Sequence, residues 1–336
     1  MTLRPSILIA GGAGYIGSHC CKALFEAGYN PVCFDNCSTG HPDFVKWGPF
    51  VRRDVRDVEA LVETLRTYNI IAVIHLAASS SVGESVVDPE NYYANNVTGS
   101  LALLRAMREV RCMQLVFSST GAVYGNASPR PISENSVCEP INPYGASKRM
   151  IEQILADYRK AYRLRSVCFR YFNACGADPS GVIGELRDPE THLIPRAMMS
   201  LLGHVAEFAV FGDDYDTPDG TAVRDYIHVT DLAAAHVSAV KLLLDGHDGG
   251  TYNLGTGHGY SVREILSSIA AETGREVRFV LKKRRDGDPP VLVASAQAAE
   301  RELKFRPASS DLATIVRSAW NWHRKAHPER PDHFGR

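Results

Sequence analysis

The chain has 336 residues, of which 45% are hydrophobic and 22% are charged, a balance typical of a globular protein with a substantial core. Its 37 Lys and Arg residues match 38 Asp and Glu residues, so no bulk charge favours nucleic acid or an anionic membrane as a partner. No uncharged apolar stretch reaches 18 residues, and glycines interrupt the first apolar run, which argues against a membrane span and a signal peptide. The eight cysteines include no CxxC pair, which indicates reduced thiols and no metal site. We therefore expect a cytoplasmic enzyme or small-molecule binder.

Short apolar runs alternate with helical periodicity through the first half of the chain. The predicted strands are 6–10, 31–35, 49–54, 71–77, 113–119 and 165–171. The predicted helices between them are 15–28, 57–68, 90–110 and 144–162. A repeat of strand and helix is typical of a parallel sheet covered on both faces. We predict an α/β fold with a Rossmann-type doubly wound parallel sheet over residues 1–175, which binds its ligand at the carboxyl ends of the strands.

The second half of the chain is less regular. A stretch rich in glycine, proline and aspartate (173–192) predicts a long functional loop. Helices are predicted at 193–203, 230–244, 261–273 and 309–324, and strands at 207–211, 222–227 and 277–281. We predict a smaller α/β substrate domain over residues 176–336 that closes over the first domain, with the segment near 222–232 returning to the first.

A glycine-rich turn, GGAGYIG (11–17), follows the first predicted strand and opens the first predicted helix. Gly11, Gly14 and Gly17 permit a tight turn, the approach of a diphosphate and close packing of the helix on the sheet, while the helix N-terminus supplies N–H groups. Asp35 ends the second predicted strand, where a carboxylate binds the adenosine ribose and repels a 2′-phosphate. The pattern predicts NAD as the cofactor, in preference to NADP.

Asp54 follows the third predicted strand and is placed to reach the adenine edge. An alternative is that Asp54 caps the next helix, although Asp57 fits that cap better. The sequence is compatible with both roles of Asp54.

Three polar residues indicate a proton-transfer site. Tyr144 and Lys148, in YGASK (144–148), are four residues apart and so share one face of a predicted helix, while Thr120 leaves a strand end in the same predicted cleft. Free tyrosine titrates near ~10, so an ionised Tyr144 requires a pKa about three units lower. We expect the Lys148 ammonium and a positive nicotinamide ring to contribute this shift. The phenolate then takes a proton from a substrate hydroxyl that Thr120 orients.

The glycine turn, Asp35, SSTGAVYG (118–125) and YGASK together resemble the extended short-chain dehydrogenase/reductase superfamily. Further stretches closely resemble the UDP-glucose/UDP-galactose 4-epimerase family over nearly the whole chain, namely 77–100, 170–185, 190–195, 219–233 and 284–290. The resemblance implies a tightly held NAD, a UDP-sugar substrate and a homodimer. It implies further NAD contacts at Tyr15, Ile16, Asn36, Ser38, Thr39, Gly40, Val55, Leu76, Ala77, Ala78, Ser80, Asn95 and Phe172. It implies UDP-sugar contacts at Asn173, His192, Leu193, Phe211, Arg224, Arg285, Asp288 and Leu292.

The chemistry of three side chains suits the contacts that the resemblance implies, and two other positions depart from the family pattern. Guanidinium groups suit phosphate oxygens, which fits Arg224 and Arg285 to the diphosphate, and Asp288 suits ribose hydroxyls. Family members often have a lysine or an aromatic residue near Ser80 and an asparagine at the position of His192.

The positions after Thr120 favour one reaction over its relatives. Family relatives that dehydrate or decarboxylate the sugar have acids there, because elimination needs a proton donor and acceptor beyond the tyrosine. Here these positions are Gly121 and Ala122, so we predict oxidation at C4 and return of hydride to the opposite face, an epimerisation.

Several alternatives stay open. Leu292 lies where the family adjusts the room around the sugar and is intermediate in size, which leaves UDP-xylose/UDP-arabinose and UDP-N-acetylglucosamine as substrates. A net NAD-dependent oxidoreductase and a non-catalytic dinucleotide sensor are other functions, although a sensor has no need for Tyr144 with Lys148. An alternative to a substrate contact at Arg224 is a buried ion pair between Arg224 and Asp225. His75 and His228 lie in apolar strands and are predicted to be core histidines, in preference to ligands.

Overall fold

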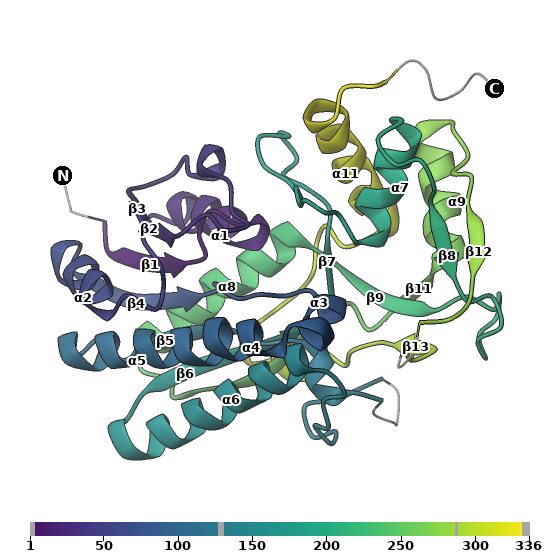
Figure 1. Ribbon diagram of the computed structural model, residues 1–336. Coiled ribbons are helices and arrows are strands. Elements are labelled where there is room, and N and C mark those ends of the chain that lie inside the picture. Colours follow the sequence, from purple (N-terminus) through teal and green to yellow (C-terminus); the bar gives the residue numbers. More distant parts are fainter. Residues whose placement is uncertain (1–3, 127–130, 286–287, 331–336) are drawn as a thin grey trace.

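A seven-stranded parallel sheet forms the centre of the larger part of the molecule (Figure 1). The computed structural model describes residues 4–126, 131–285 and 288–330. Across the sheet the strands are β10 (Gly249–Leu254), β6 (Arg165–Tyr171), β5 (Gln114–Ser118), β4 (Ile70–His75), β1 (Ser6–Ala10), β2 (Asn30–Asp35) and β3 (Phe50–Arg52). All neighbouring pairs run parallel, which confirms the predicted Rossmann-type sheet.

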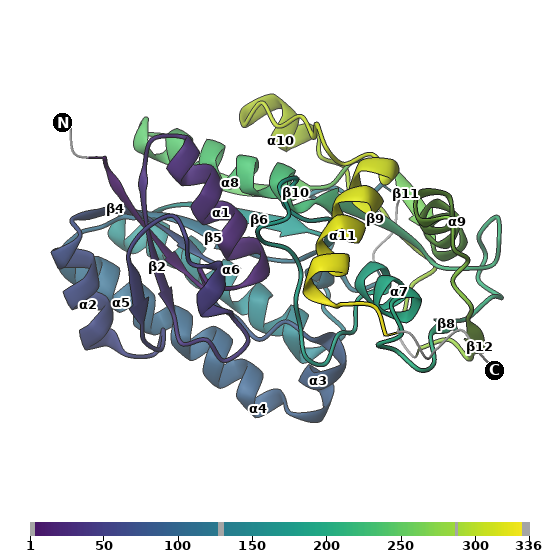
Figure 2. The ribbon, with the colours of Figure 1, turned by 90° about the horizontal axis from the view of Figure 1, so that it is seen from above.

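Helices cover both faces of this sheet (Figures 1 and 2). Because side chains alternate along a strand, Ile7 and Ile9 of β1 pack with Leu24 on one face, and Leu8 packs with Leu61 on the other. The first face is covered by α1 (Tyr15–Glu26) and α8 (Val229–Leu244), and the opposite face by α2 (Val58–Thr67), α5 (Gly99–Val110) and α6 (Pro143–Tyr162). The predicted helices at 15–28, 57–68 and 144–162 match α1, α2 and α6.

Strand β10 is absent from the predicted elements. Its sequence, GGTYNL, is poor in apolar residues. Gly249 has a φ of +88°, a backbone conformation that only glycine adopts readily. A Cβ on Gly249 would lie 1.9 Å from the Ser166 carbonyl oxygen, so the strand pairs with β6 because it begins with glycine. The chain returns to the first sheet with α8 and β10. Residues Val223–His228, most of the stretch 222–232 that was predicted to return, form a strand of the second sheet instead.

The predicted helix at 90–110 is divided in the structure. It consists of α4 (Pro89–Tyr92), a π-helical segment (Tyr93–Thr98) and α5. Single π-helical turns inside helices are frequent at functional sites. A further short helix that the periodicity did not predict, α3 (Val82–Val87), precedes them.

The smaller part of the molecule has its own sheets and core. Strand β9 (Val223–His228) pairs with β7 (Asn173–Cys175), β11 (Gly259–Ser261) and β13 (Val291–Leu292), and β8 (Ala209–Phe211) pairs with β12 (Val280–Lys282). Three helices share its apolar core: α7 (Leu193–Leu201), α9 (Val262–Thr273) and α11 (Leu312–Ala326). The remaining helix, α10 (Gln297–Glu302), packs beside β10. None of the helices in the described part of the chain has the length and apolar character needed to cross a lipid bilayer.

Cysteine thiols and histidine rings are among the side chains buried in the molecule. All eight cysteines are free thiols, as predicted. His228 hydrogen-bonds Ser318 and Thr230 and is a satisfied core histidine, as predicted. His75 is buried as well, but only its Nε2 has a partner, the Ser100 hydroxyl at 2.9 Å.

Because four histidines are buried, we predict that the free energy of unfolding falls in mild acid. Burial lowers the pKa of His19, His236 and His323 to about 4 and that of His75 to about 3. These pKa values lie below the unfolded value near ~6.5, so the unfolded chain binds more protons as the pH falls through that range. Each histidine therefore subtracts up to about 1.4 kcal/mol from the free energy of unfolding per pH unit between about pH 6 and about pH 4.

Denaturant unfolding at a series of pH values measures this effect. We expect the free energy of unfolding to fall steeply from about pH 6.5 to about pH 5, where carboxylates still hold their charge. The exposed His258 offers a control, because H258Q should leave the slope unchanged. A free energy of unfolding that stays constant over this range would contradict the account.

Candidate active site

The glycine turn and α1 form one end of the candidate site. Gly11 has φ +86°, which an L side chain rarely adopts, and a Cβ on Gly17 would lie 2.0 Å from the Gly11 carbonyl oxygen. Gly14 is the N-cap of α1 and provides no side-chain cap, so N–H groups of the first turn remain for a ligand. Tyr15 donates a hydrogen bond of 2.6 Å from its hydroxyl to the Gly176 carbonyl and ties this turn to the loop after β7.

Asp35 lies beside this turn at the end of β2. Its two carboxylate oxygens accept hydrogen bonds from the backbone N–H groups of Ala13 at 3.0 Å and Cys37 at 2.7 Å. Each oxygen keeps a lone pair for a further donor, such as a ribose hydroxyl. The rest of the predicted cofactor loop follows Asp35 and packs on Ala13 through Gly40, and it contains Asn36, Ser38 and Thr39.

Asp54 does not cap α2. The N-cap is Asp57, which accepts a hydrogen bond from the Ala60 N–H at 3.0 Å, as its position in the sequence favoured. Asp54 instead accepts from the Arg56 guanidinium at 2.8 Å and from Asn36 at 2.9 Å, and the Arg56 hydrogen bond is the main cause of its lowered pKa. Val55, next to it, is buried.

The end of β4 supplies the next side of the site. The N–H groups of Leu76 and Ala77 both donate to the Ala10 carbonyl, which brings this end against β1, and Ala78 and Ser80 follow. Asn95, in the π-helical segment, donates to the Ser79 hydroxyl at 3.2 Å. Its neighbour Asn96, which the sequence did not single out, links the Ser79 carbonyl to Ser147 on α6.

Tyr144, Thr120 and Lys148 meet where α6 begins beside the end of β5. Asn142 caps this helix by accepting a hydrogen bond from the Gly145 N–H at 2.8 Å. A Cβ on Gly145 would lie 2.6 Å from the Ala122 carbonyl oxygen, so the absence of a side chain lets the first turn of α6 approach the residues after Thr120. The sequence-predicted trio is therefore brought to one place.

Opposing effects act on the pKa of Tyr144. Burial raises the pKa of Tyr144, while a hydrogen bond with Thr120 and the positive charge of Arg187 lower it. Burial also lowers the pKa of Lys148 to about 7, and its Nζ donates to the Ser118 carbonyl at 2.8 Å. Arg187 is thus a second positive charge that lowers the pKa of this phenol, and the stabilisation of the phenolate by Lys148 stays a prediction.

Packing explains why the residues after Thr120 are small. A Cβ on Gly121 would lie 3.2 Å from the ring of Phe172, which stacks with the ring of Tyr124. Thr120 accepts a hydrogen bond from the Ala122 N–H at 3.1 Å, so its hydroxyl proton is left to be donated, here toward Tyr144. Thr120, Gly121 and Ala122, which follow β5, thus offer a hydroxyl group and no acid.

Four of the predicted substrate residues form two contacts in the smaller part of the molecule. Arg224 on β9 forms an ion pair with Asp288, and the Arg285 guanidinium lies 4.1 Å from the centre of the Phe211 ring. The alternative that Arg224 pairs with Asp225 is wrong. Asp225 is buried, and its carboxylate accepts hydrogen bonds from the backbone N–H groups of Thr256, Gly257 and Ala294. Asp286 and Gly287, in the stretch 284–290, lie outside the described residues.

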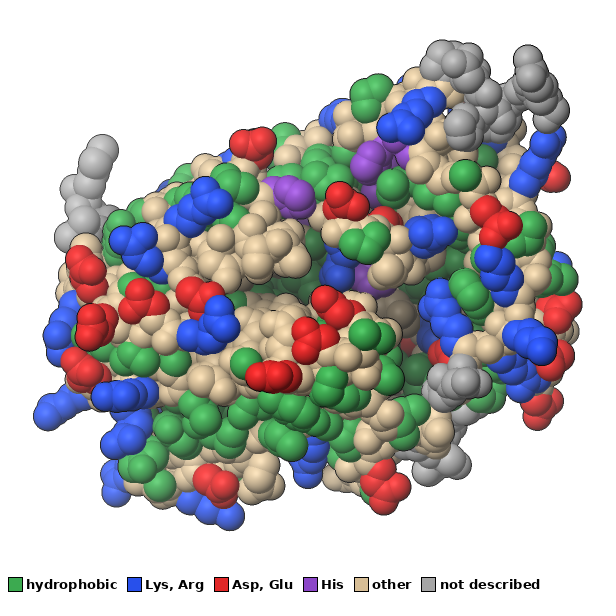
Figure 3. Space-filling view, viewed as in Figure 1, with side chains coloured by type: hydrophobic (Ala, Val, Ile, Leu, Met, Phe, Trp, Pro, Cys, Tyr) green, Lys and Arg blue, Asp and Glu red, His purple; other side chains and the backbone are tan. Residues whose placement is uncertain are grey.

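Two other predicted substrate residues, Asn173 and Leu292, lie beside Arg224. Asn173 on β7 donates to the Asp225 carbonyl at 3.1 Å, and Leu292 on β13 is the register partner of Arg224. Leu193 begins α7, whose N-cap is His192. In Figure 3 this face is hollowed between the two parts of the molecule, and basic and histidine side chains lie in the hollow.

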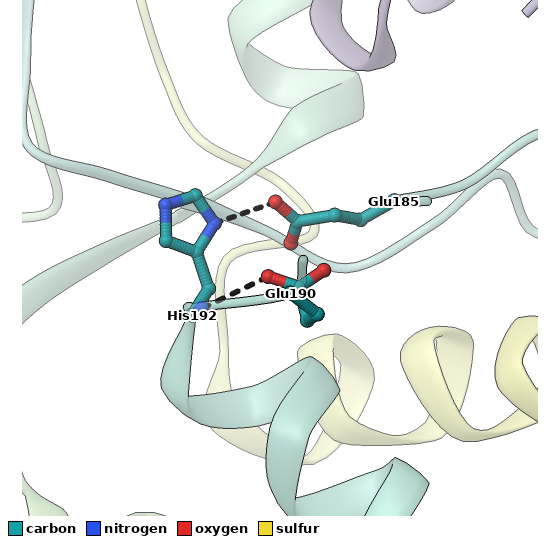
Figure 4. A group of neighbouring side chains, drawn as sticks. All are labelled: Glu185, Glu190 and His192. Atoms are coloured by element: carbon teal, nitrogen blue, oxygen red, sulfur yellow. Dashed lines mark hydrogen bonds and ion pairs between the residues drawn. The ribbon is translucent and has the colours of Figure 1, made fainter. Parts of the chain in front are cut away.

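Two glutamates hold His192 in place (Figure 4). The Glu185 carboxylate lies 2.6 Å from His192 Nδ1, and Glu190 accepts hydrogen bonds from the N–H groups of Thr191 and His192. Among the described residues this is the one group of three His, Cys, Asp or Glu side chains close enough to hold a metal ion. Since its atoms already bond one another and the backbone, the contacts indicate a group that fixes the His192 ring. The Glu185 carboxylate raises the pKa of His192, whose side chain is 45% exposed.

The family model for the NAD dependent epimerase/dehydratase family matches residues 7–255 of this chain. This chain belongs to that family. The matched residues span the whole seven-stranded sheet apart from its first residue, together with β7 and β9 of the second sheet.

Individual members of the epimerase/dehydratase family are similar over nearly the whole chain. A UDP-glucose 4-epimerase of Rhizobium leguminosarum bv. trifolii is 50% identical over 321 residues, which are 96% of this chain and 98% of that protein. A crystal structure of UDP-glucose 4-epimerase from Brucella ovis in complex with NAD is 53% identical, with a TM-score of 0.93 over 94% of this chain and 97% of that one. A UDP-glucose-4-epimerase structure from Stenotrophomonas maltophila with bound NAD and formylated UDP-arabinopyranose is 40% identical, with a TM-score of 0.93 over 96% and 99%.

Arg187 and Glu185 are site residues that the sequence did not single out. They lie in the stretch 173–192, which composition predicts only as a long loop. A glutamate and an arginine in a polar loop carry no periodicity. Only the folded loop shows that Glu185 is buried and that Arg187 contacts Glu185 and Ser80.

Proposed function

We propose that this chain catalyses the NAD-dependent 4-epimerisation of a UDP-sugar, with UDP-glucose and UDP-galactose as the substrate pair. One observation carries the proposal: Tyr144 and Thr120 meet at the end of β5, where Gly121 and Ala122 offer no acid. Relatives that share half of this sequence are named UDP-glucose 4-epimerase, which supports the same reaction here.

The residues present fit NAD. The uncapped first turn of α1 offers N–H groups to a diphosphate, and a positive-φ glycine turn leaves the approach free of side chains. Asp35 is hydrogen-bonded to Ala13 of this turn, and its carboxylate oxygens keep lone pairs for a ribose hydroxyl. A carboxylate there also repels a 2′-phosphate, which favours NAD over NADP.

The chain's own residues manage the proton in this reaction. When bound, NAD accepts a hydride from C4 of the sugar and later returns it. Tyr144 takes the proton of the 4-hydroxyl in the oxidising half and gives it back in the reducing half. Thr120, whose hydroxyl accepts from the Ala122 N–H, turns its proton from Tyr144 to the same sugar oxygen when the sugar is bound and holds that oxygen in line.

The second sheet holds the nucleotide in this proposal. Arg224 and Arg285 bind the diphosphate, and Asp288 binds ribose hydroxyls after its ion pair with Arg224 opens. Leu292 and Phe211 supply apolar contacts, and Asn173, His192 and Leu193 complete the set. Binding through UDP leaves the sugar free to turn and present either face of C4.

We also propose a homodimer and a cytoplasmic location, with a role in galactose metabolism. The support for the homodimer is an apolar surface over α5, α6 and the π-helical segment, where Leu101 and Met150 are 38% and 46% exposed beside Val97. Sedimentation velocity measures the stoichiometry, and L101E with M150E is expected to shift a dimer to monomers.

A product assay tests the proposed function. The purified protein is incubated with UDP-galactose, UDP-N-acetylglucosamine and UDP-xylose separately, and the products are separated by chromatography. We expect UDP-glucose to form from UDP-galactose without net NADH. A UDP-pentose is the second candidate, because a neighbour is described with formylated UDP-arabinopyranose. Stoichiometric NADH in solution would indicate an oxidoreductase instead, and no reaction with any UDP-sugar would refute the proposal.

A further inference from the structure

A buried ion pair joins α6 to β6 next to the residues that follow β5. The Arg170 guanidinium of β6 donates two hydrogen bonds to the Glu152 carboxylate of α6, from Nε to Oε1 at 2.8 Å and from Nη2 to Oε2 at 2.6 Å. The two side chains are 5% and 3% exposed. Moving two charges from water into the interior costs about as much as their attraction gains, so such a pair adds little stability in comparison with apolar residues of similar size. What the paired hydrogen bonds do fix is one relative geometry of the two groups.

Glu152 holds the first residue after β5. The Ser119 hydroxyl, which has no exposed surface, donates a hydrogen bond of 2.6 Å to Glu152 Oε1. One turn earlier on α6, the Nζ of Lys148 donates to the Ser118 carbonyl at 2.8 Å. Two consecutive residues at the end of β5 are thus held by two successive turns of the helix that carries Tyr144.

Arg170 holds the other end of the same segment. Its Nη1 donates a hydrogen bond of 2.9 Å to the Tyr124 hydroxyl, and this hydroxyl donates to Oδ1 of Asn253 on β10 at 2.7 Å. Tyr124 and Asn253 are both buried. Thr120 therefore lies in a short segment, 119–124, whose two ends are held by a single ion pair.

We propose that the ion pair of Glu152 and Arg170 is a positioning element of the epimerisation, which holds Thr120 in line with Tyr144. This inference rests on the proposed function. Tyr144 and Glu152 lie eight residues apart on the same side of α6, so one helix carries both the proton acceptor and the carboxylate that holds the segment with the Thr120 hydroxyl. Placement matters because a shift of about 1 Å in a reacting group can cost about a hundredfold in rate. Neither Glu152 nor Arg170 touches the sugar, and both act through the segment 119–124.

Ser119→Ala tests this role with a small change. It removes one hydroxyl and leaves both charges of the ion pair in place. We expect kcat for UDP-galactose, expressed per bound NAD, to fall about tenfold while KM stays within about twofold, because the proposed UDP contacts lie in the smaller part of the molecule. A merely structural role would reduce the amount of folded, NAD-loaded protein and leave kcat per bound NAD unchanged, which would overturn the inference.

Ser310 provides the matched control. It is a buried serine just before α11, and its hydroxyl donates a hydrogen bond of the same length, 2.6 Å, to the Asp231 carboxylate of α8. Ser310→Ala removes an equivalent hydrogen bond and should leave kcat per bound NAD and KM unchanged. Equal falls in kcat in the two serine variants would overturn the inference, because the loss of any buried hydrogen bond would then account for them.

Two further variants test the ion pair from its other side. Tyr124→Phe keeps the ring and loses the hydrogen bonds to Arg170 and Asn253, and we expect kcat to fall with an unchanged KM. Glu152→Leu combined with Arg170→Met removes both charges together, so that no unpaired charge stays buried, and the fold is expected to survive with the same fall in kcat. If the double variant does not fold, Tyr124→Phe and Ser119→Ala decide the question.

The outcomes separate this inference from the proposed function. Wild-type kcat in Ser119→Ala and Tyr124→Phe, or in a folded double variant, would overturn the positioning role while the activity of the wild type left the proposed function standing. Absence of epimerase activity in the wild type itself would refute the proposed function, and the inference with it.

Discussion

Replacing Tyr144 with phenylalanine is expected to lower kcat by about 10³-fold and to leave the protein folded with its NAD content unchanged. The variant removes only the hydroxyl, since the phenylalanine ring keeps the edge contact with the ring of Tyr92, whose centre lies 6.4 Å away. Without the phenol, the residues after Thr120 cannot take the proton of the sugar hydroxyl, because Gly121 and Ala122 have no ionisable side chain. Turnover of UDP-galactose and the NAD released on denaturation are the two measurements.

A tyrosine on the same helix provides the control for this prediction. Tyr162 ends α6, is 43% exposed and packs on Tyr158, far from Thr120 in the sequence. Y162F should therefore keep full activity. Activity of the Tyr144 variant within about tenfold of wild type would mean that another group carries the proton, and the proposed role of Tyr144 would be wrong.

The second large effect is expected at the glycine turn. In Gly17→Ala the new Cβ would lie 2.0 Å from the Gly11 carbonyl oxygen, and both atoms belong to backbone that cannot move without shifting α1. We expect the first turn of α1 to move from its place, with loss of bound NAD and of about 1–3 kcal/mol or more of stability. NAD content and a thermal melt measure the two losses.

Gly83 offers a matched glycine for comparison. It lies in α3, and no atom comes within 4 Å of a Cβ built there. Gly83→Ala should therefore keep NAD and melt at the wild-type temperature or slightly above it, because alanine favours a helix. If Gly17→Ala behaved in the same way, the close approach of α1 to the turn would not be required for cofactor binding.

Strongly periodic elements could be predicted from the sequence. Strands β1 and β6 begin and end where the apolar runs do, because a strand buried on both faces has to be apolar along its whole length. β10 was missed for the opposite reason: it lies at the sheet edge, begins with two glycines, and pairs through its backbone. The π-helical segment was missed because one inserted residue barely alters an amphipathic pattern.

The candidate site was predictable where local chemistry marks it. The glycine turn, Asp35 and the pair Tyr144 and Lys148 have fixed spacings that derive from one turn or one helix. The partners of Arg224 and Asp225 were not predictable in this way, since neighbours on a strand point to opposite faces and find partners from other segments. The same holds for Arg187, whose contacts with Glu185 and Ser80 depend on how the long loop folds back over β4.

The central claim is that the hydrogen on C4 of the sugar leaves and returns within one active site. UDP-glucose that carries deuterium at C4, incubated with the protein in ordinary water, tests this claim most directly by mass and NMR analysis of the product. The account predicts UDP-galactose with the deuterium still at C4, and no NADH in solution. Product with solvent hydrogen at C4, or deuterium released into free NADH, would contradict it.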